Sequence, residues 1–342
     1  MRNNLGYITI ILIISISTLS AFSFETSQIK VGSNPWAVSI NPTRNIIYVT
    51  NSGNDTVSVI DGKTNAVIKN ITVGENPTGV AVNQKTNTVY VSKFSSPTVS
   101  VINGTTNTVT ENITVGKQPN GIGIDETTNK IYVTNMGSSS VSVIDGKTNS
   151  VLTTISVGAR PTAVSVNPST GIAYVTNSGA GTISVINETT DTVITTISTG
   201  SGPTGVTVNP KTDTIYISSS KTPQVFVING NTNTVSANVT VGAYPDGVSA
   251  NPNTNRIYVA NSGDGTVSVI DGATNTVSQT IQAGTHVYGI VVNPSTGTVY
   301  AGNDSPGIVY VISEMEPQSS IWDGIIQFFS NLFNFKKIVM NF

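Results

Sequence analysis

The residues of this chain that are best suited to chemistry flank a proline that recurs along it. The proline stands at Pro35, Pro77, Pro119, Pro161, Pro203 and Pro245, and Val287 takes the seventh place. The residue before it is, in turn, Asn34, Asn76, Gln118, Arg160, Gly202, Tyr244 and His286. The residue after it is Trp36, Thr78, Asn120, Thr162, Thr204, Asp246 and Tyr288. Aromatic and charged side chains on loops of a rigid scaffold are what a binding site uses.

We therefore predict one ligand-binding face, made by Trp36, Asn120, Arg160, Tyr244, Asp246, His286 and Tyr288. The aromatic rings would supply stacking area, and Arg160 with Asp246 would supply oriented polar contacts, as in sugar or peptide recognition. A purely structural role stays open. Arg160 would then bond only loop carbonyls, Trp36 and Tyr288 would fill a wider mouth, and His286 would reflect decay of the last repeat.

Few residues point to catalytic or metal chemistry. The chain has no cysteine and a single histidine. This excludes disulfides, thiol nucleophiles, thiolate zinc sites and any site built on several imidazoles. The loop carboxylates stand singly or in different repeats: Asp55, Glu75, Asp246, Asp264 and Asp304. Since no base is paired with a nucleophile and no carboxylates cluster, the sequence predicts no catalytic residue, no metal and no cofactor.

Seven Asn-x-Ser/Thr sequons are candidate glycosylation sites: Asn54, Asn70, Asn103, Asn112, Asn187, Asn238 and Asn303. Asn70, Asn112 and Asn238 share one register, in the stretch where each repeat is expected to form its outermost strand. Chance occurrence is the alternative, because the chain is rich in Asn and Thr.

The composition limits the class of partner. Charged residues make up only 10% of the chain and the formal net charge is −2. No basic footprint for a nucleic acid is present. The polar residues are mainly Ser, Thr, Asn and Gly, which suits an exposed protein.

A repeat of 42 residues positions all of these side chains. Its tyrosine falls at Tyr48, Tyr90, Tyr132, Tyr174, Tyr216, Tyr258 and Tyr300. Each unit reads as four short strands, which in the second repeat are residues 79–83, 88–92, 98–103 and 108–115. β-Branched residues alternate along them, and Asn, Asp, Pro and Gly mark the turns. The sequence thus predicts an all-β, seven-bladed β-propeller of four-stranded antiparallel blades.

The two ends of the array predict how the ring closes. After Tyr300 a third strand follows over residues 307–312, and residues 314–317 interrupt any fourth. Upstream, residues 28–32 align with residues 70–74, the fourth strand of a repeat. We predict that an N-terminal strand, residues 25–31, completes the last blade, because closure removes exposed sheet edges.

The segments outside the propeller, which spans 24–313, carry other signals. Residues 1–23 have a positive start, an apolar run and small residues before a cleavage point, which predicts a signal peptide. An uncleaved anchor is the alternative. Residues 314–320 form a polar linker, and 321–342 have the period of an amphipathic helix. Contact of this helix with the propeller, a second copy or a membrane surface stays open, as does a cleaved sorting signal.

The repeat resembles a known family. Tyr48-Val49-Thr50-Asn51 and its copies at Tyr132 and Tyr174 match the signature of the YVTN-type β-propeller repeat, with degenerate copies at the other four tyrosines. The preceding Val-Gly-x-x-Pro-x-Gly-Val and the following Val-Ser-Val-Ile-Asp-Gly also match, over about residues 28–313. The resemblance implies a secreted or surface-layer protein but no defined activity.

We therefore predict an exported cell-surface propeller that is a non-catalytic binding or structural scaffold. Its loop face would take a glycan, a cell-wall polymer or a protein partner. The alternative is a lactonase- or esterase-like hydrolase with a metal in the central funnel, although the resemblance to seven-bladed lactonases stops at the fold.

Overall fold

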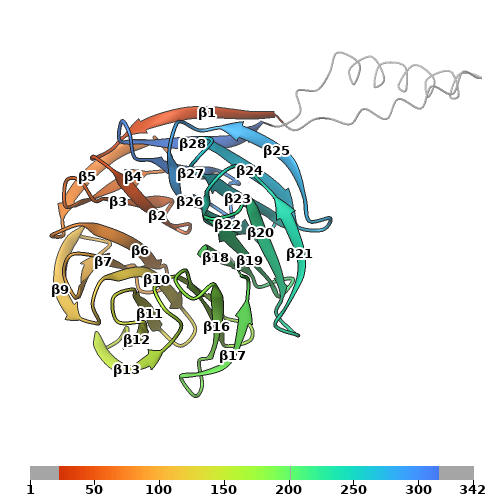
Figure 1. The fold of residues 1–342 in the computed structure, drawn as a ribbon. Helices are drawn as coiled ribbons and strands as arrows, with labels where there is room; N and C mark the ends of the chain where they lie inside the picture. The colour runs from red at the N-terminus through yellow and green to blue at the C-terminus, as the bar shows by residue number, and fades with distance from the viewer. Residues whose placement is uncertain (1–22, 201, 316–342) are drawn as a thin grey trace, which may run out of the picture. The chain divides into compact units, whose positions relative to one another are not determined.

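The computed structural model describes residues 23–200 and 202–315, of which residues 25–313 form one compact unit. Strands β1 to β28 build seven four-stranded sheets that follow one another around a central axis (Figure 1). Neighbouring strands within a sheet pair antiparallel. The prediction of an all-β, seven-bladed propeller is confirmed. We number the blades along the chain, starting with the sheet that begins at Pro35.

Four layers of strands run from the axis outward. The innermost strands are β2 (Pro35–Asn41), β6 (Pro77–Asn83), β10 (Pro119–Asp125), β14 (Pro161–Asn167), β18 (Pro203–Asn209), β22 (Pro245–Asn251) and β26 (Val287–Val292). The second strands are β3 (Ile46–Asn51), β7 (Thr88–Lys93), β11 (Lys130–Asn135), β15 (Ile172–Asn177), β19 (Thr214–Ser219), β23 (Arg256–Asn261) and β27 (Val299–Asn303).

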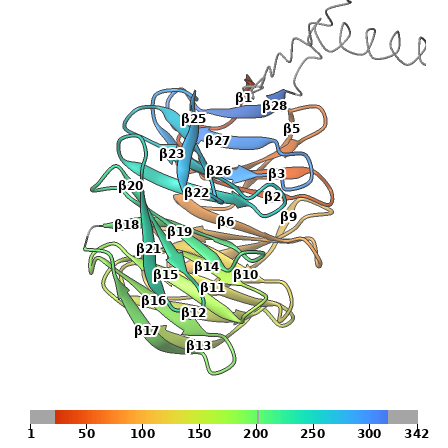
Figure 2. The same ribbon diagram turned by 90° about the vertical axis from the view of Figure 1, so that its right-hand side faces the viewer.

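The third strands are β4 (Thr56–Asp61), β8 (Thr98–Asn103), β12 (Ser140–Asp145), β16 (Thr182–Asn187), β20 (Gln224–Asn229), β24 (Thr266–Asp271) and β28 (Ile308–Met315). The outer strands are β5 (Ala66–Thr72), β9 (Thr108–Thr114), β13 (Ser150–Ser156), β17 (Thr192–Ser198), β21 (Thr234–Thr240), β25 (Thr276–Gln282) and β1 (Ser23–Lys30). In both ribbon views β13 and β17 lie at the periphery of the ring (Figure 2).

The seventh blade combines the two ends of the ring. Its sheet has the order β1-β28-β27-β26, so its outer strand precedes blade 1 in the sequence. The amide of Val31 donates to the carbonyl of Gly307 at 3.0 Å. Ile29 is buried in one cluster with Val309 and Val311. The chain thereby joins its first described strand to its last one.

The core lies between blades, where the second and third strands of neighbouring sheets face each other. The repeat tyrosines are fully buried, and β-branched residues of the adjacent blade surround them. The Tyr90 hydroxyl donates to Oδ1 of Asn149 at 3.2 Å, and that of Tyr174 to Oδ1 of Asn233 at 3.2 Å. Each tyrosine thus fills the gap between two sheets, which explains its fixed spacing, and the hydroxyls of Tyr48, Tyr90, Tyr132 and Tyr174 also bond to the next blade.

Several predictions concern residues outside the described ranges. The signal peptide falls on residues 1–22 apart from its last residue, and the amphipathic helix falls entirely on residues 316–342. The linker is described only as far as Met315. Within the described ranges no helix is long and apolar enough to cross a membrane.

Candidate functional site

A β-bulge at the start of every innermost strand positions the residue after the proline. In blade 1 the register passes from the pair Pro35–Asn51 to the pair Val38–Val49, so Trp36 and Ala37 stand outside the ladder. The other six blades repeat this shift. Bulges re-aim side chains. Here they present the residues that follow the proline, one from each blade, to the axis.

In blades 1 to 5 a hydroxyl group of the second strand holds the bulge in place. Oγ1 of Thr50 accepts from the amide of Ala37 at 2.9 Å and donates to the carbonyl of Thr78, in the next blade, at 2.9 Å. Four further residues make the same bridge: Ser92, Thr134, Thr176 and Ser218. Ala260 and Gly302 take this place in blades 6 and 7, so the bridge lacks its hydroxyl there.

The bulges surround a cavity of about 480 Å³ on the axis, which we call the funnel. Its wall is made by Trp36, Ala37, Ser52, Asn76, Thr78, Gly79, Phe94, Asn120, Gly121, Met136, Thr162, Ala163, Thr204, Gly205, Asp246, Gly247, Tyr288 and Gly289. Below it, a ring of Gly and Ala and then a ring of Val and Ile enclose a narrower space of about 190 Å³. A Cβ at Gly121 would lie 2.6 Å from the carbonyl oxygen of Thr162, so neighbouring inner strands approach too closely for most side chains.

The funnel wall is asymmetric. Blades 6, 7 and 1 contribute Asp246, Tyr288 and Trp36, whereas the corresponding residues of blades 2 to 5 are Thr or Asn. The rings of Trp36 and Tyr288 stack with their centroids 4.8 Å apart and their planes inclined by 16°. Trp36 nevertheless keeps 39% of its surface exposed. Three adjacent blades therefore form one aromatic and acidic sector.

Among the described residues, Asp246 is the only carboxylate that lines the funnel, and no basic residue lines it. Burial raises the pKa of Asp246 to about 6. The pKa of Tyr288 is also raised, first by burial and then by the charges of Asp304 and Asp246. The funnel therefore favours positive charge.

The structure separates the seven predicted site residues into two groups. Trp36, Asn120, Asp246 and Tyr288 line the funnel. Arg160, Tyr244 and His286 do not. The seven residues therefore do not all line one cavity, and a role of any of them in ligand binding stays a prediction.

The residues before the proline differ in where they lie: Asn76, with a φ of 53°, lines the funnel, whereas Arg160 and Tyr244 do not. Arg160 and Tyr244 have φ values of 51° and 49°, in the left-handed region. Their side chains lie over the glycines of the loop between the second and third strands, Gly179 and Gly263. The His286 ring is exposed, and its Nδ1 lies 3.7 Å from Oδ1 of Asp304. All three residues belong to the rim of the loop face.

Among the funnel residues that the prediction left out, Phe94 and Met136 carry the two largest apolar side chains. Each directly follows the last residue of a second strand, where other blades have Ser52, Ser178, Ser220, Ser262 and Asp304. The departure from serine was a signal that the sequence contained. Phe94 belongs to blade 2 and Met136 to blade 3.

The sequons differ in accessibility. Asn54, Asn70, Asn103, Asn112 and Asn238 are exposed, and Asn187 is half-buried. Asn303 is 1% exposed, and its Nδ2 donates to the carbonyl of Ser305 at 2.9 Å. Its place in the repeat is that of the buried Asn51, whose Nδ2 binds Oγ of Ser58. Glycosylation of the folded chain at Asn303 conflicts with this burial.

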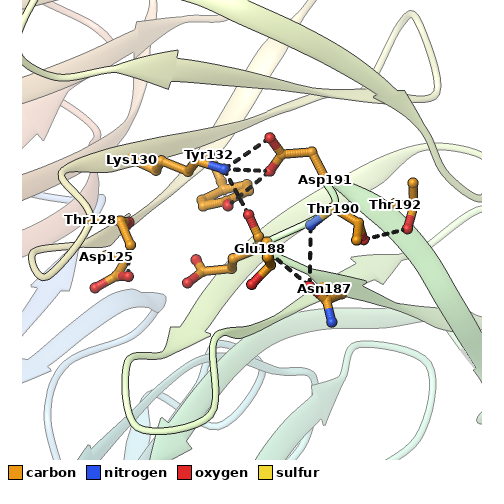
Figure 3. Close-up of polar contacts among 10 residues, drawn as sticks. Asp125, Thr128, Lys130, Tyr132, Asn187, Glu188, Thr190, Asp191 and Thr192 are labelled. Atoms are coloured by element: carbon orange, nitrogen blue, oxygen red, sulfur yellow. Dashed lines mark hydrogen bonds and ion pairs between the residues drawn. The ribbon is translucent and has the colours of Figure 1, made fainter.

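A second polar cluster, unpredicted from the sequence, joins blades 3 and 4 at the opposite end of the inner strands (Figure 3). Lys130 donates to both carboxylate oxygens of Asp191 at 2.9 Å and to the carbonyl of Glu188 at 2.7 Å. The carboxyl group of Glu188 is directed toward that of Asp125 (Figure 3), and Glu188 is only 4% exposed. Burial and then the Asp125 charge raise the pKa of Glu188 to about 7.

This cluster replaces an amide link found at other blade junctions. Nδ2 of Asn83 donates to Oδ1 of Asn129 at 2.7 Å, for example, and Asn167 donates to Asp213 at 2.7 Å. At the junction of blades 3 and 4, Asp125 stands in place of the donor and Gly171 in place of the acceptor. Glu188, in place of a repeat glycine, occupies the space so freed.

Within the described ranges no group of three or more His, Cys, Asp or Glu residues is placed to hold a metal ion. In the funnel, Asp246 would be the sole charged ligand, and Asn120 and Asn76 are the amide side chains of the wall. This donor set is poorer than the six to eight oxygens that calcium takes.

Comparisons with known proteins establish the fold. The chain matches no protein-family model and no curated protein. Among solved structures it is similar to a chain described as "Kuenenia stuttgartiensis Hydrazine Synthase", with a TM-score of 0.77 and 18% identity. The similarity covers 82% of this chain and 96% of that one. Such a likeness shows a shared propeller, and membership of the YVTN-type family stays a prediction.

Proposed function

We propose that this chain is an exported, non-catalytic binding protein that receives part of its ligand in the funnel. The observation that supports this most directly is the sector formed by Asp246, Tyr288 and Trp36. Positions that only complete the wall are occupied by Thr in three of the other four blades. Large aromatic and acidic residues in three consecutive blades are therefore more than the ring needs for its construction.

The exposure of the aromatic pair supports a binding role over a filling role. A ring that only filled the mouth of the funnel would gain most by full burial, since burial of apolar surface is its main stabilising term. Trp36 instead leaves 39% of its surface accessible while its ring is held in place by Tyr288. A rigid, partly exposed aromatic surface in a concave site is typical of ligand pockets.

Export and a cell-surface location are part of this proposal. They rest on the predicted signal peptide, on the resemblance to surface-layer propellers and on the exposure of Asn70, Asn112 and Asn238 on the outer strands. The N-terminal strand would act as the clasp that keeps the exported ring closed. Residues 321–342 would add contact with a membrane surface or a second copy.

The test is a binding screen of the full chain against glycans, cell-wall fragments and surface proteins. Trp36→Ala and Asp246→Asn should weaken the binding of any hit by about fivefold or more, because a central anchor residue contributes about 1–3 kcal/mol. Asp145→Asn is the matched control, since Asn103 and Asn187 fill the same turn position in other blades. A hit whose binding ignores both funnel variants would show that the ligand uses another face.

The hydrolase alternative has its own measurement. The purified protein should be analysed for bound metal and assayed with lactones and simple esters. Turnover that depends on a stoichiometric metal and disappears in Asp246→Asn would replace the non-catalytic proposal.

A further inference from the structure

We propose that the group bound in the funnel is an organic cation, an ammonium or a guanidinium, held between the Asp246 carboxylate and the stacked rings of Trp36 and Tyr288. The inference rests on the proposed function and names the chemical class of its ligand. It makes no use of the rim residues.

The charge of the wall is the first reason. Among the residues that line the funnel, Asp246 is the only acidic side chain and none is basic. No donor or basic side chain within residues 23–200 and 202–315 engages its carboxylate, and burial alone shifts its pKa upward. Asp246 is only partly exposed, and a partly desolvated, uncompensated carboxylate is costly. A ligand cation would compensate it and would gain more there than in water, because the apolar wall strengthens the attraction.

The aromatic sector is the second reason. Asp246, Tyr288 and Trp36 follow one another in blades 6, 7 and 1, so a group beside the carboxylate also meets an aromatic face. Cations bind to the faces of Trp and Tyr, and the attraction grows when the site excludes water. Phe94 and Met136 add a polarisable surface from blades 2 and 3.

The hydroxyl groups of the wall argue against a neutral sugar as the inserted group. Oγ1 of Thr162 lies 2.9 Å from Oγ1 of Thr176 and donates to the carbonyl of Thr204 at 3.0 Å. The hydroxyls of Thr78 and Thr204 are engaged in the same way with Ser92 and Ser218. Sugar recognition needs many free donors and acceptors, whereas these hydroxyls already serve the wall. Asp246 and Asn120 remain as polar side chains free to meet a ligand.

The volume sets the size of the bound group. About 480 Å³ is in the range of pockets for small molecules. It admits a free amine of modest size, or the end of one Lys or Arg side chain of a larger partner. Both sources share the same chemistry.

The experiment titrates the full-length protein with tetramethylammonium chloride, arginine amide and a short Arg-containing peptide, with glucose and sodium acetate as neutral and anionic probes. Calorimetry and the fluorescence of Trp36, compared with the Trp36→Phe variant, report binding. The cations should bind saturably and the other probes should not. Asp246→Asn should weaken cation binding at least tenfold, Trp36→Ala should weaken it severalfold, and Asp145→Asn should leave it unchanged.

The outcomes distinguish failure of the cation assignment from failure of the funnel as the binding site. If glucose or acetate binds and Trp36→Ala abolishes this binding, the ligand is not a cation, but the funnel remains the binding site. If Asp246→Asn and Trp36→Ala both leave cation binding unchanged, the cation does not bind in the funnel, and the proposed function is weakened too. The same holds if no probe binds and the screen finds a ligand whose binding neither variant changes. Equal affinity for arginine amide and the peptide would assign a free cation. Much tighter binding of the peptide would assign a basic side chain of a protein partner.

Discussion

Trp36 and Tyr288 stack on each other although one opens the first blade and the other lies in the last, with ring centroids 4.8 Å apart. Their contact spans the junction at which the ring closes. Blades 6 and 7, which adjoin this contact, have Ala260 and Gly302 in place of the residue with the bridging hydroxyl. The proposed ligand site therefore depends on closure, and local folding of either blade alone could not form it.

Removal of the N-terminal strand is the direct test of that dependence. Deletion of residues 25–31 should lower the melting temperature sharply, because β28 loses its neighbouring strand. The exposed edge of β28 should also favour association between molecules. Ile29→Ala should destabilise by about 2–4 kcal/mol, since Ile29 is buried with Val309 and Val311. Thr26→Ala, at an exposed position of the same strand, is the control. A deleted protein that melts at the normal temperature and stays monomeric would contradict this prediction.

The omitted hydroxyl at Gly302 predicts a stabilising substitution. Gly302→Thr should supply a group that accepts from the amide of Gly289 and donates to the carbonyl of Trp36, as Thr50 does one blade later. A Cβ at Gly302 has room, since its nearest contact would be Val38 at 3.5 Å. We expect a gain of about 1 kcal/mol in the free energy of unfolding. Gly302→Ala separates the backbone effect from the hydroxyl, and equal stability of both variants would refute the hydroxyl's role.

The left-handed backbone of Arg160 predicts another gain. Asn34 and Asn76 occupy the same position in other blades with φ values of 52° and 53°. Asn adopts this region at lower cost than Arg. Arg160→Asn should therefore raise stability by a few tenths of a kcal/mol to about 1 kcal/mol, measured by urea unfolding. Arg160→Ala keeps the backbone strain and should not raise stability. A gain in that variant would show that the left-handed φ is not the cause.

The buried pair of Glu188 and Asp125 predicts a loss of stability at rising pH. The pKa of Glu188 is raised to about 7 from its ordinary value of 4.5, so the folded state binds more protons than the unfolded state between these values. The free energy of unfolding should accordingly fall as pH rises from about 4.5 to 7, by on the order of 2–3 kcal/mol. Asp125 acts in the opposite sense. Burial raises its pKa, but hydrogen bonds from Thr127 and Thr128 outweigh this and lower it. Its contribution is therefore lost only in stronger acid.

Glu188→Gln is the variant that checks this dependence. Its amide donates to Asp125 at any pH, so the slope of stability between pH 5 and pH 8 should flatten. The measurement belongs in the Asp246→Asn background, because the pKa of Asp246 is also raised, to about 6, and gives a slope of the same sign. An unchanged slope in the double variant would show that Glu188 does not carry the effect.

The fold was readable from the sequence because its determinants repeat. The fixed spacing of the tyrosines, and the alternation of β-branched residues around them, specify blades without reference to any distant contact. The place of Trp36 and Tyr288 in one site was also predictable, since any closed ring brings the equivalent positions of its blades together.

The side on which each loop residue lies was not predictable. Arg160 and Asp246 each adjoin a repeated proline, yet Arg160 lies at the rim over Gly179, whereas a bulge turns Asp246 toward the axis. Hydrophobic periodicity does not report these backbone details. The proximity of Glu188 to Asp125 was not predictable either, because it depends on three substitutions at separate repeat positions, Asp125, Gly171 and Glu188, that meet only in the folded ring.

The bulge after each proline has an evolutionary consequence. Residues such as Trp36 and Asp246 stand outside the ladder hydrogen bonds, while the hydroxyl bridges and the buried tyrosines stabilise the ring independently of them. Mutation at such positions can therefore change specificity with little risk to folding, whereas Thr78, Thr162 and Thr204 also bond to the bridging hydroxyls. A ring built from duplicated units begins with seven identical walls. Divergence at these few codons is enough to give it a single, oriented pocket.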